Sequence, residues 1–111
     1  MNEYENAEIA MTLIAYSGEA RTKAFEALKC ARNNDYLQAN ELMNQAKQSS
    51  LKAHESQTEL LVSEANGNPV ILNVLLVHAQ DHLMTSMLAL ELIQEMIELH
   101  ELKEDKKGVE K

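Results

Sequence analysis

The sequence predicts an all-α fold in which three long helices form an up-down-up antiparallel bundle. The composition is rich in strong helix formers, among them Ala, Leu, Glu, Met, Gln and Lys, and apolar residues recur with a helical period. The 111 residues include only three Gly and one Pro, too few for the turns of an all-β sandwich. We therefore expect a single three-helix domain over residues 1–103.

The first helix is expected over residues 2–32, because Asn2 and Glu5 have the spacing of a capping box. The first break follows at 33–35, where Asp35 can cap a second helix over residues 35–65. The apolar positions of the first helix are Ile9, Leu13, Tyr16, Ala20, Ala24, Ala27, Leu28 and Ala31, and those of the second are Ala39, Leu42, Met43, Ala46, Ala53, Leu60 and Leu61.

The second break, Gly67-Asn68-Pro69, combines a helix-ending Gly with a capping Asn and a Pro suited to a first helical position. These residues predict a third helix over 69–103. Residues 104–111 are charged and lack an apolar period, so we expect them to fray. Short connections between long helices make sequence neighbours antiparallel.

The third helix has two apolar stripes, whereas packing against two sister helices needs only one. The first stripe comprises Leu72, Leu76, Ala79, Leu83, Met87, Leu90 and Ile97, and the second comprises Ile71, Val74, Leu75, Ala89, Leu92, Ile93 and Met96. Monomers rarely expose large contiguous apolar patches. The second stripe therefore indicates homo-oligomerisation, although the pattern does not define the number of subunits.

Four polar residues interrupt this apolar surface: His78, Asp81, His82 and Thr85. Their spacing places them on one helix face, where they could bind a metal, orient one another or act in nucleophilic chemistry. On the second helix, His54 and Gln57 are expected level with Asp81 and His78, as part of a polar layer through the bundle. Histidines that simply hydrogen-bond to neighbours in a core or an interface remain the structural alternative.

Charge and composition exclude several classes of function. Eighteen acidic against ten basic residues give a net charge of −8, which disfavours nucleic acid and anionic membrane surfaces as partners. The sequence has no signal-peptide pattern and no apolar run of membrane-spanning length. The lone Cys30 cannot form an internal disulfide, and we expect it to be an inert core thiol. A cytoplasmic location is expected.

Residues 77–85 (VHAQDHLMT) resemble the signature of the enzyme IIA components of the lactose/cellobiose class of the phosphoenolpyruvate-dependent sugar phosphotransferase system. The resemblance extends to residues 86–89 and 98–101 of the third helix, 15–21 of the first and 53–58 of the second. The third helix is more similar to the cellobiose/diacetylchitobiose branch than to the lactose branch.

This resemblance implies a homotrimer in which each subunit accepts a phosphoryl group on His78 from the phosphocarrier HPr. It also implies transfer to the cysteine of a IIB component, which phosphorylates a β-linked disaccharide entering through a membrane IIC component. Asp81 is implied to hold a divalent cation, expected to be Mg²⁺, on the trimer axis together with its two symmetry copies. His82 and Gln80 are expected to support the phosphoryl oxygens.

Histidine suits such a carrier because a neutral imidazole is a nucleophile and also a good leaving group. We expect Nε2 of His78 to carry the phosphoryl group while a hydrogen bond orients Nδ1. The alternative function is a non-enzymatic oligomeric adaptor with an interface metal site formed by His78, Asp81 and His82.

Four residues outside the predicted polar face also have expected roles. Val77 and Met84 are expected to form an apolar docking patch for HPr and IIB. Gly18 is expected to allow close helix packing. Arg21 is expected to be a solvated surface residue, with contact to a phosphoryl group as the alternative.

Overall fold

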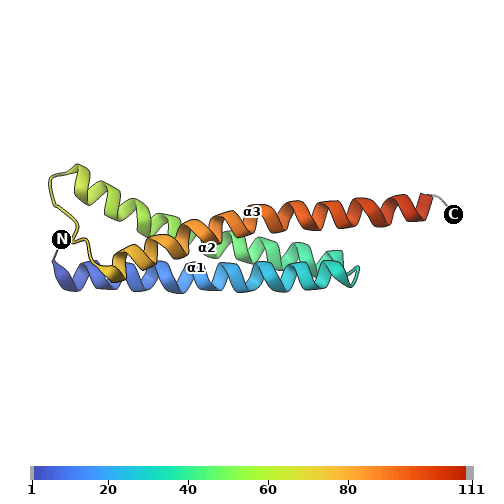
Figure 1. Ribbon diagram of the computed structural model, residues 1–111, viewed down its shortest axis with the longest axis horizontal. Coiled ribbons are helices and arrows are strands. Elements are labelled where there is room, and N and C mark those ends of the chain that lie inside the picture. The colour runs from blue at the N-terminus through green and yellow to red at the C-terminus, as the bar shows by residue number, and fades with distance from the viewer. Residues whose placement is uncertain (1, 110–111) are drawn as a thin grey trace.

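The structure, a computed structural model, describes residues 2–109 of the chain, with side chains through residue 106. It contains three α-helices, α1 (Glu3–Arg32), α2 (Tyr36–Ala65) and α3 (Val74–Val109). They form an elongated bundle of 64 × 20 × 19 Å, in which α1 packs against both α2 and α3 (Figure 1). The predicted all-α, up-down-up fold is confirmed.

Local capping defines the first two helices as the sequence predicts. The side chain of Asn2 accepts a hydrogen bond from the Glu5 backbone N–H at 2.8 Å, and its Nδ2 donates to Glu5 Oε1 at 2.8 Å. Asp35 Oδ1 accepts from the backbone N–H of Gln38 at 3.2 Å. Asn34 lies between the two helices with a φ of 63°, a left-handed conformation that Asn tolerates well.

The expected start of the third helix at residue 69 is wrong, because α3 begins at Val74. The Asn73 side chain accepts from the backbone N–H of Leu76 at 2.9 Å and so caps the helix. Nδ2 of the buried Asn6 donates to the carbonyl of Ile71 at 3.0 Å. This contact holds the connection after Gly67 against α1, and α3 begins more than one helical turn after the expected position.

The C-terminal segment also differs from the expectation. Residues 104–109 are not frayed but continue α3, which extends beyond the end of the α1–α2 pair in Figure 1. Three of its six residues, Glu104, Lys106 and Lys107, have high intrinsic helix propensity, which favours continuation of the helix. Residues 110–111 lie outside the described residues.

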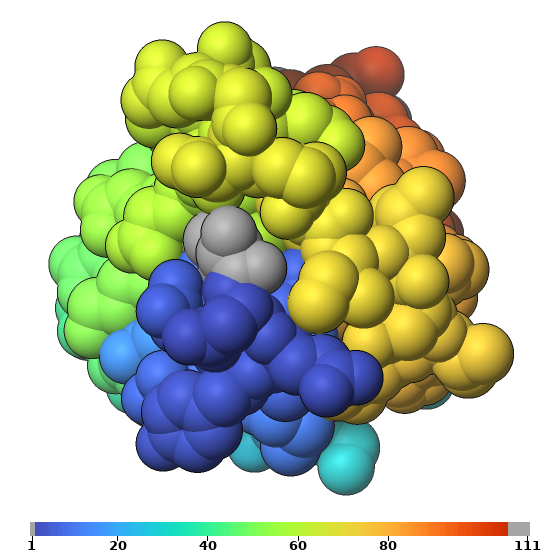
Figure 2. All heavy atoms as spheres, turned by 90° about the vertical axis from the view of Figure 1, so that its left-hand side faces the viewer, coloured from blue at the N-terminus to red at the C-terminus, as the bar shows by residue number. Residues whose placement is uncertain are grey.

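Small side chains let the helices approach closely. Ala10, Ala20, Ala24, Ala27 and Ala31 of α1 are all completely buried. Larger core residues fill the space between them, mostly at positions predicted from the apolar period: Leu13, Leu42, Met43, Leu60, Leu76, Leu83, Leu90, Ile93 and Ile97. Figure 2 shows the bundle from the end at which α1 begins, where α1, the 66–73 connection and the start of α3 pack around the axis.

Gly18 and Cys30 both lie in α1. A Cβ built on Gly18 meets no atom within 4 Å, so the expectation that Gly18 permits close helix packing within the chain is wrong. Cys30 is half-buried and packs against the core cluster at the end of the bundle where α1 turns into α2. Within residues 2–109, no helix combines the length and apolar character required to cross a membrane.

Candidate functional site

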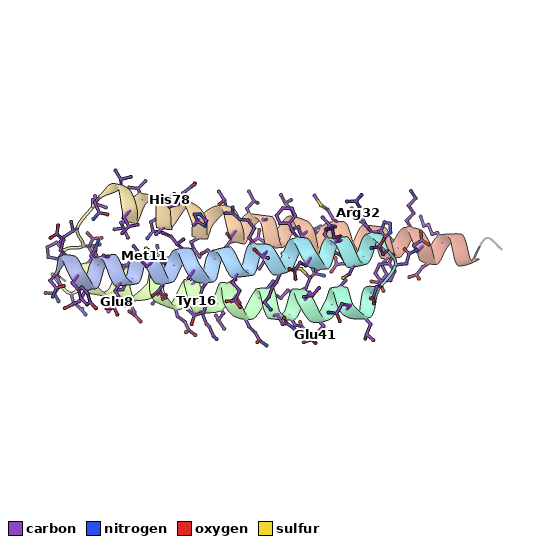
Figure 3. The ribbon with its side chains drawn as sticks, turned by 90° about the horizontal axis from the view of Figure 1, so that it is seen from below. Glu8, Met11, Tyr16, Arg32, Glu41 and His78 are labelled. Atoms are coloured by element: carbon purple, nitrogen blue, oxygen red, sulfur yellow. The ribbon has the colours of Figure 1, made fainter. Side chains whose placement is uncertain are left out.

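The predicted site residues lie together on the first three turns of α3. His78, Asp81 and Thr85 are exposed, whereas His82 is half-buried. The rings of His78 and His82 meet edge to face, with centroids 4.7 Å apart and an interplanar angle of 74°. In Figure 3, His78 lies between the levels of Met11 and Tyr16 along the bundle. The i, i+4 spacing therefore brings two imidazoles into contact at the protein surface.

The environment of His82 favours its neutral form. Burial lowers the pKa of His82 below its ordinary value, and the positive charges of Arg21 and His78 lower it further, while Asp81 acts in the opposite direction. Its Nδ1 is buried without a hydrogen-bond partner among the described residues. A neutral imidazole carries one N–H donor, so His82 can donate one hydrogen bond to a group bound beside His78.

Arg21 connects α1 to the histidine face of α3. Its Nε donates to Ser86 Oγ at 3.2 Å, and its Nη2 donates to Thr85 Oγ1 at 2.8 Å. The expectation of a solvated surface arginine is therefore wrong. The sequence could not indicate this contact because it depends on how α1 and α3 are aligned. The guanidinium contributes a positive charge one turn after His82.

We expect Arg21→Ala to lower the free energy of unfolding by about 1–2 kcal/mol, because two interhelical hydrogen bonds to a charged group are lost. Chemical denaturation of the two proteins would measure this difference. Arg32→Ala is the matched control at the exposed end of α1 and should change stability by less than about 0.5 kcal/mol. Equal effects of the two substitutions would contradict a specific role for the Arg21 contacts.

The structure does not bring Gln80 to His78. Residues two positions apart do not share a helix face, and Gln80 Nε2 donates to Gln57 Oε1 on α2 at 2.6 Å. His54 is exposed, and its side chain forms no hydrogen bond with another described residue; its backbone carbonyl accepts from Thr58 Oγ1 at 3.0 Å. The expected polar layer is thus reduced to the Gln57–Gln80 pair, and the predicted phosphoryl support by Gln80 has no geometric basis within one chain.

An exposed apolar stripe runs along α3, and Asp81 lies on the midline of this stripe as seen around the helix axis. At 100° per residue, the stripe falls within about 60° of Asp81 and contains Val74, Val77, Met84, Leu88, Leu92, Met96, Leu99 and Leu102, each between 48% and 86% exposed. The stripe differs from the second stripe expected from the sequence, because Ile93 is in the core at 3% exposure. Val77 and Met84 belong to this stripe and do not form a separate patch.

The Asp81 carboxylate forms no hydrogen bond or ion pair with another described side chain. In the described part of a single chain, no cluster of three or more His, Cys, Asp or Glu side chains could hold a metal ion. A metal site at Asp81 would therefore need carboxylates from more than one chain.

Comparisons with known proteins show the family to which the chain belongs and agree with its fold. Residues 8–101 match the family model described as the lactose/cellobiose specific IIA subunit of the PTS system. The N,N'-diacetylchitobiose-specific EIIA component of Escherichia coli K12 is 48% identical over 97 residues, which cover 87% of this chain and 84% of that protein.

Solved structures agree with these sequence matches. The cellobiose-specific enzyme IIA of Bacillus anthracis is similar with a TM-score of 0.89 and 43% identity, over 96% of this chain and 95% of that one. The IIA(Chitobiose) chain of the Escherichia coli IIA–HPr complex has a TM-score of 0.77 and 45% identity, over 94% of this chain and 99% of that one.

The three-helix bundle, the contact between His78 and His82, and these relatives together define the class of protein: a phosphotransfer component of a sugar phosphotransferase system. Within that class, the chain belongs to the lactose/cellobiose specific IIA family. Membership in this family favours phosphotransfer over the adaptor alternative.

Proposed function

We propose that the chain accepts a phosphoryl group from phospho-HPr on His78 and passes it to the cysteine of a cognate IIB component in the cytoplasm. The observation that carries this proposal is the exposed imidazole of His78 against His82, in a chain of the IIA family. The solved complex of the similar IIA(Chitobiose) protein with HPr supports HPr as the donor. The hydrogen bond expected to orient Nδ1 of His78 is not found, because neither ring nitrogen of His78 bonds to a described residue.

In the first transfer, a lone pair on Nε2 of His78 attacks the phosphorus of phospho-HPr. The bond between that phosphorus and the HPr histidine breaks, and its electron pair returns to the HPr imidazole. In the second transfer, the IIB thiolate attacks the same phosphorus and the His78 imidazole leaves. Such transfers require little covalent assistance from the protein, which mainly positions the group and stabilises its charge.

The residues around His78 provide this stabilisation. The neutral His82 supplies an N–H donor, and its ring is held 4.7 Å from that of His78. Arg21 adds a fixed positive charge through its bonds to Thr85 and Ser86. A group with two negative charges is stabilised by donors and cations fixed before it arrives.

We propose further that the stripe around Asp81 is the interface of a homotrimer. Burial of its apolar side chains would remove a large exposed patch from water, and the three Asp81 carboxylates would meet near the axis. Like charges at such a site repel one another unless a cation neutralises them. Carboxylate oxygens suit Mg²⁺, so Asp81 and its two copies would hold this ion, which would supply charge neutralisation.

We expect Asp81→Asn to make the trimer independent of divalent cations, because the amide removes the repulsion without changing side-chain size. Chelation with EDTA should lower the melting temperature of the native protein by on the order of 5 °C, equivalent to about 1 kcal/mol. The Asp81→Asn protein should show no such change. An EDTA-insensitive native trimer in light scattering and thermal melts would contradict a structural role for the metal.

The sugar class proposed for the whole system is a β-linked disaccharide of the diacetylchitobiose, cellobiose or lactose type. The names of the relatives support this range. Transfer assays would test the function and narrow the class: the phosphorylated chain is mixed with purified IIB components for each sugar. The cognate IIB should gain about 80 Da at its cysteine while this chain loses the same mass. Retention of the phosphoryl group with every such IIB would contradict the proposal.

A further inference from the structure

Two buried polar atoms near the site have no hydrogen-bond partner among the described residues. One is Oγ of Ser17 on α1, whose side chain is 1% exposed, and the other is Nδ1 of His82 on α3. Buried polar groups are rarely left unpaired because each one costs about 1–3 kcal/mol. Both atoms therefore require an explanation, and neither atom has a role in the proposed transfer steps.

The alignment of α1 with α3 places these atoms at the same level. The two helices run in the same direction, and their side-chain contacts join residues 65 positions apart: Asn6 with Ile71, and Arg21 with Ser86. The same offset pairs Ser17 with His82. Ser17 also lies one helical turn before Arg21, and the charge of Arg21 acts on His82.

The hydroxyl proton of Ser17 is available for such a contact. Serine inside a helix often donates to the carbonyl four residues earlier, but Ser17 Oγ forms no hydrogen bond of this kind. Its hydroxyl can take another staggered position by rotation about χ1. Nδ1 of a neutral imidazole is an acceptor when the ring proton is on Nε2.

We propose that Ser17 is a positioning residue for His82: its O–H donates to Nδ1 and thereby fixes the ring proton on Nε2. The buried edge of His82 then serves as acceptor, and the opposite edge presents an N–H beside His78. This inference rests on the proposed function, in which that N–H donates to a phosphoryl oxygen. Ser17 would set the tautomer and orientation of His82 before the phosphoryl group arrives.

The first test is nitrogen-15 NMR of the His82 ring in the full chain, at a pH where the histidines are neutral. In the native protein, we expect a protonated Nε2 and an Nδ1 signal shifted by hydrogen bonding. Ser17→Ala should move the Nδ1 signal toward that of an unbonded imine nitrogen, and Ser17→Thr should restore it. A proton on Nδ1 in the native protein, or an unchanged Nδ1 signal in Ser17→Ala, would overturn the proposal.

The second test is the rate of phosphoryl transfer from phospho-HPr. Ser17→Ala should slow transfer about 3- to 10-fold, the effect of one hydrogen bond, and Ser17→Thr should recover most of the rate. The melting temperature should fall by a few degrees, because Ala removes one interhelical hydrogen bond and leaves the buried Nδ1 unpaired, so rates are compared at a temperature where every variant is folded. Ser49→Ala, at a buried serine of α2, is the matched control and should leave the rate unchanged.

The two tests separate the inference from the function on which it rests. The NMR measurement needs no phosphoryl donor, so it decides the Ser17–His82 contact by itself. A native chain that accepts no phosphoryl group would contradict the proposed function. A native chain that accepts phosphoryl normally, together with a Ser17→Ala chain of equal rate, would overturn the positioning role alone.

Discussion

A His78→Ala chain is expected to accept no phosphoryl group from phospho-HPr while it keeps its fold. The side chain of His78 is exposed and forms no hydrogen bond with another residue in the described part of the chain, so its removal should cost little stability. The substitution removes the nucleophile, and the neighbouring His82 is half-buried with an unpaired Nδ1 in the interior. We expect the transfer rate to fall by at least about 10³-fold, as when other enzymes lose their nucleophile.

The matched control is His54→Ala, because His54 is also exposed and lies on α2, away from the histidine pair of α3. This variant should be phosphorylated at the native rate. Stopped-flow mixing with phospho-HPr, followed by mass spectrometry under non-acidic conditions, would measure both variants. Phosphorylation of the His78→Ala chain at more than a small fraction of the native rate would refute the assignment.

A Leu88→Glu chain is expected to be monomeric under conditions in which the native chain is a trimer. Leu88 is 55% exposed in the single chain and lies two helical turns after Asp81 on the same stripe. Assembly would bring three new carboxylates together beside the Asp81 group, and it would also forgo the burial of three leucines. We estimate a loss of about 3 kcal/mol per subunit, which corresponds to about a 100-fold weaker association for each subunit.

Leu37→Glu provides a control of the same chemistry on another surface. Leu37 is 87% exposed at the start of α2 and lies outside the stripe. Sedimentation velocity of the three proteins at equal concentration would measure assembly, and circular dichroism would verify the helices. A trimeric Leu88→Glu protein would contradict the interface proposal, as would dissociation of both variants to the same extent.

The sequence predicted those parts of the fold that local interactions determine. Asn2 with Glu5, and Asp35 with Gln38, form the expected caps because each interaction spans only three residues. The start of α3 was not predictable in the same way, because the Asn6–Ile71 hydrogen bond joins segments 65 residues apart. Pro69 is compatible with a helix start, but the chain uses Asn73 as its cap.

The same distinction applies to the site. The shared face of His78, Asp81 and His82 follows from helix geometry, and the structure confirms the contact between the two rings. The contacts of Arg21 with this face, and the Ser17 contact that we propose, could not be read from the sequence because they depend on the alignment of α1 with α3. Gln80 was expected to support the phosphoryl group because it lies two residues after His78, but within one chain the helix period directs it toward Gln57.

The most direct test of the account is the mass of the native chain after incubation with phosphoenolpyruvate, enzyme I and HPr. We predict a gain of about 80 Da per chain, the mass of one phosphoryl group, which is lost on acidification as expected for phosphohistidine. Peptide mapping should place the group on His78. A folded native chain that gains no mass, or gains it at another residue, would contradict the central claim.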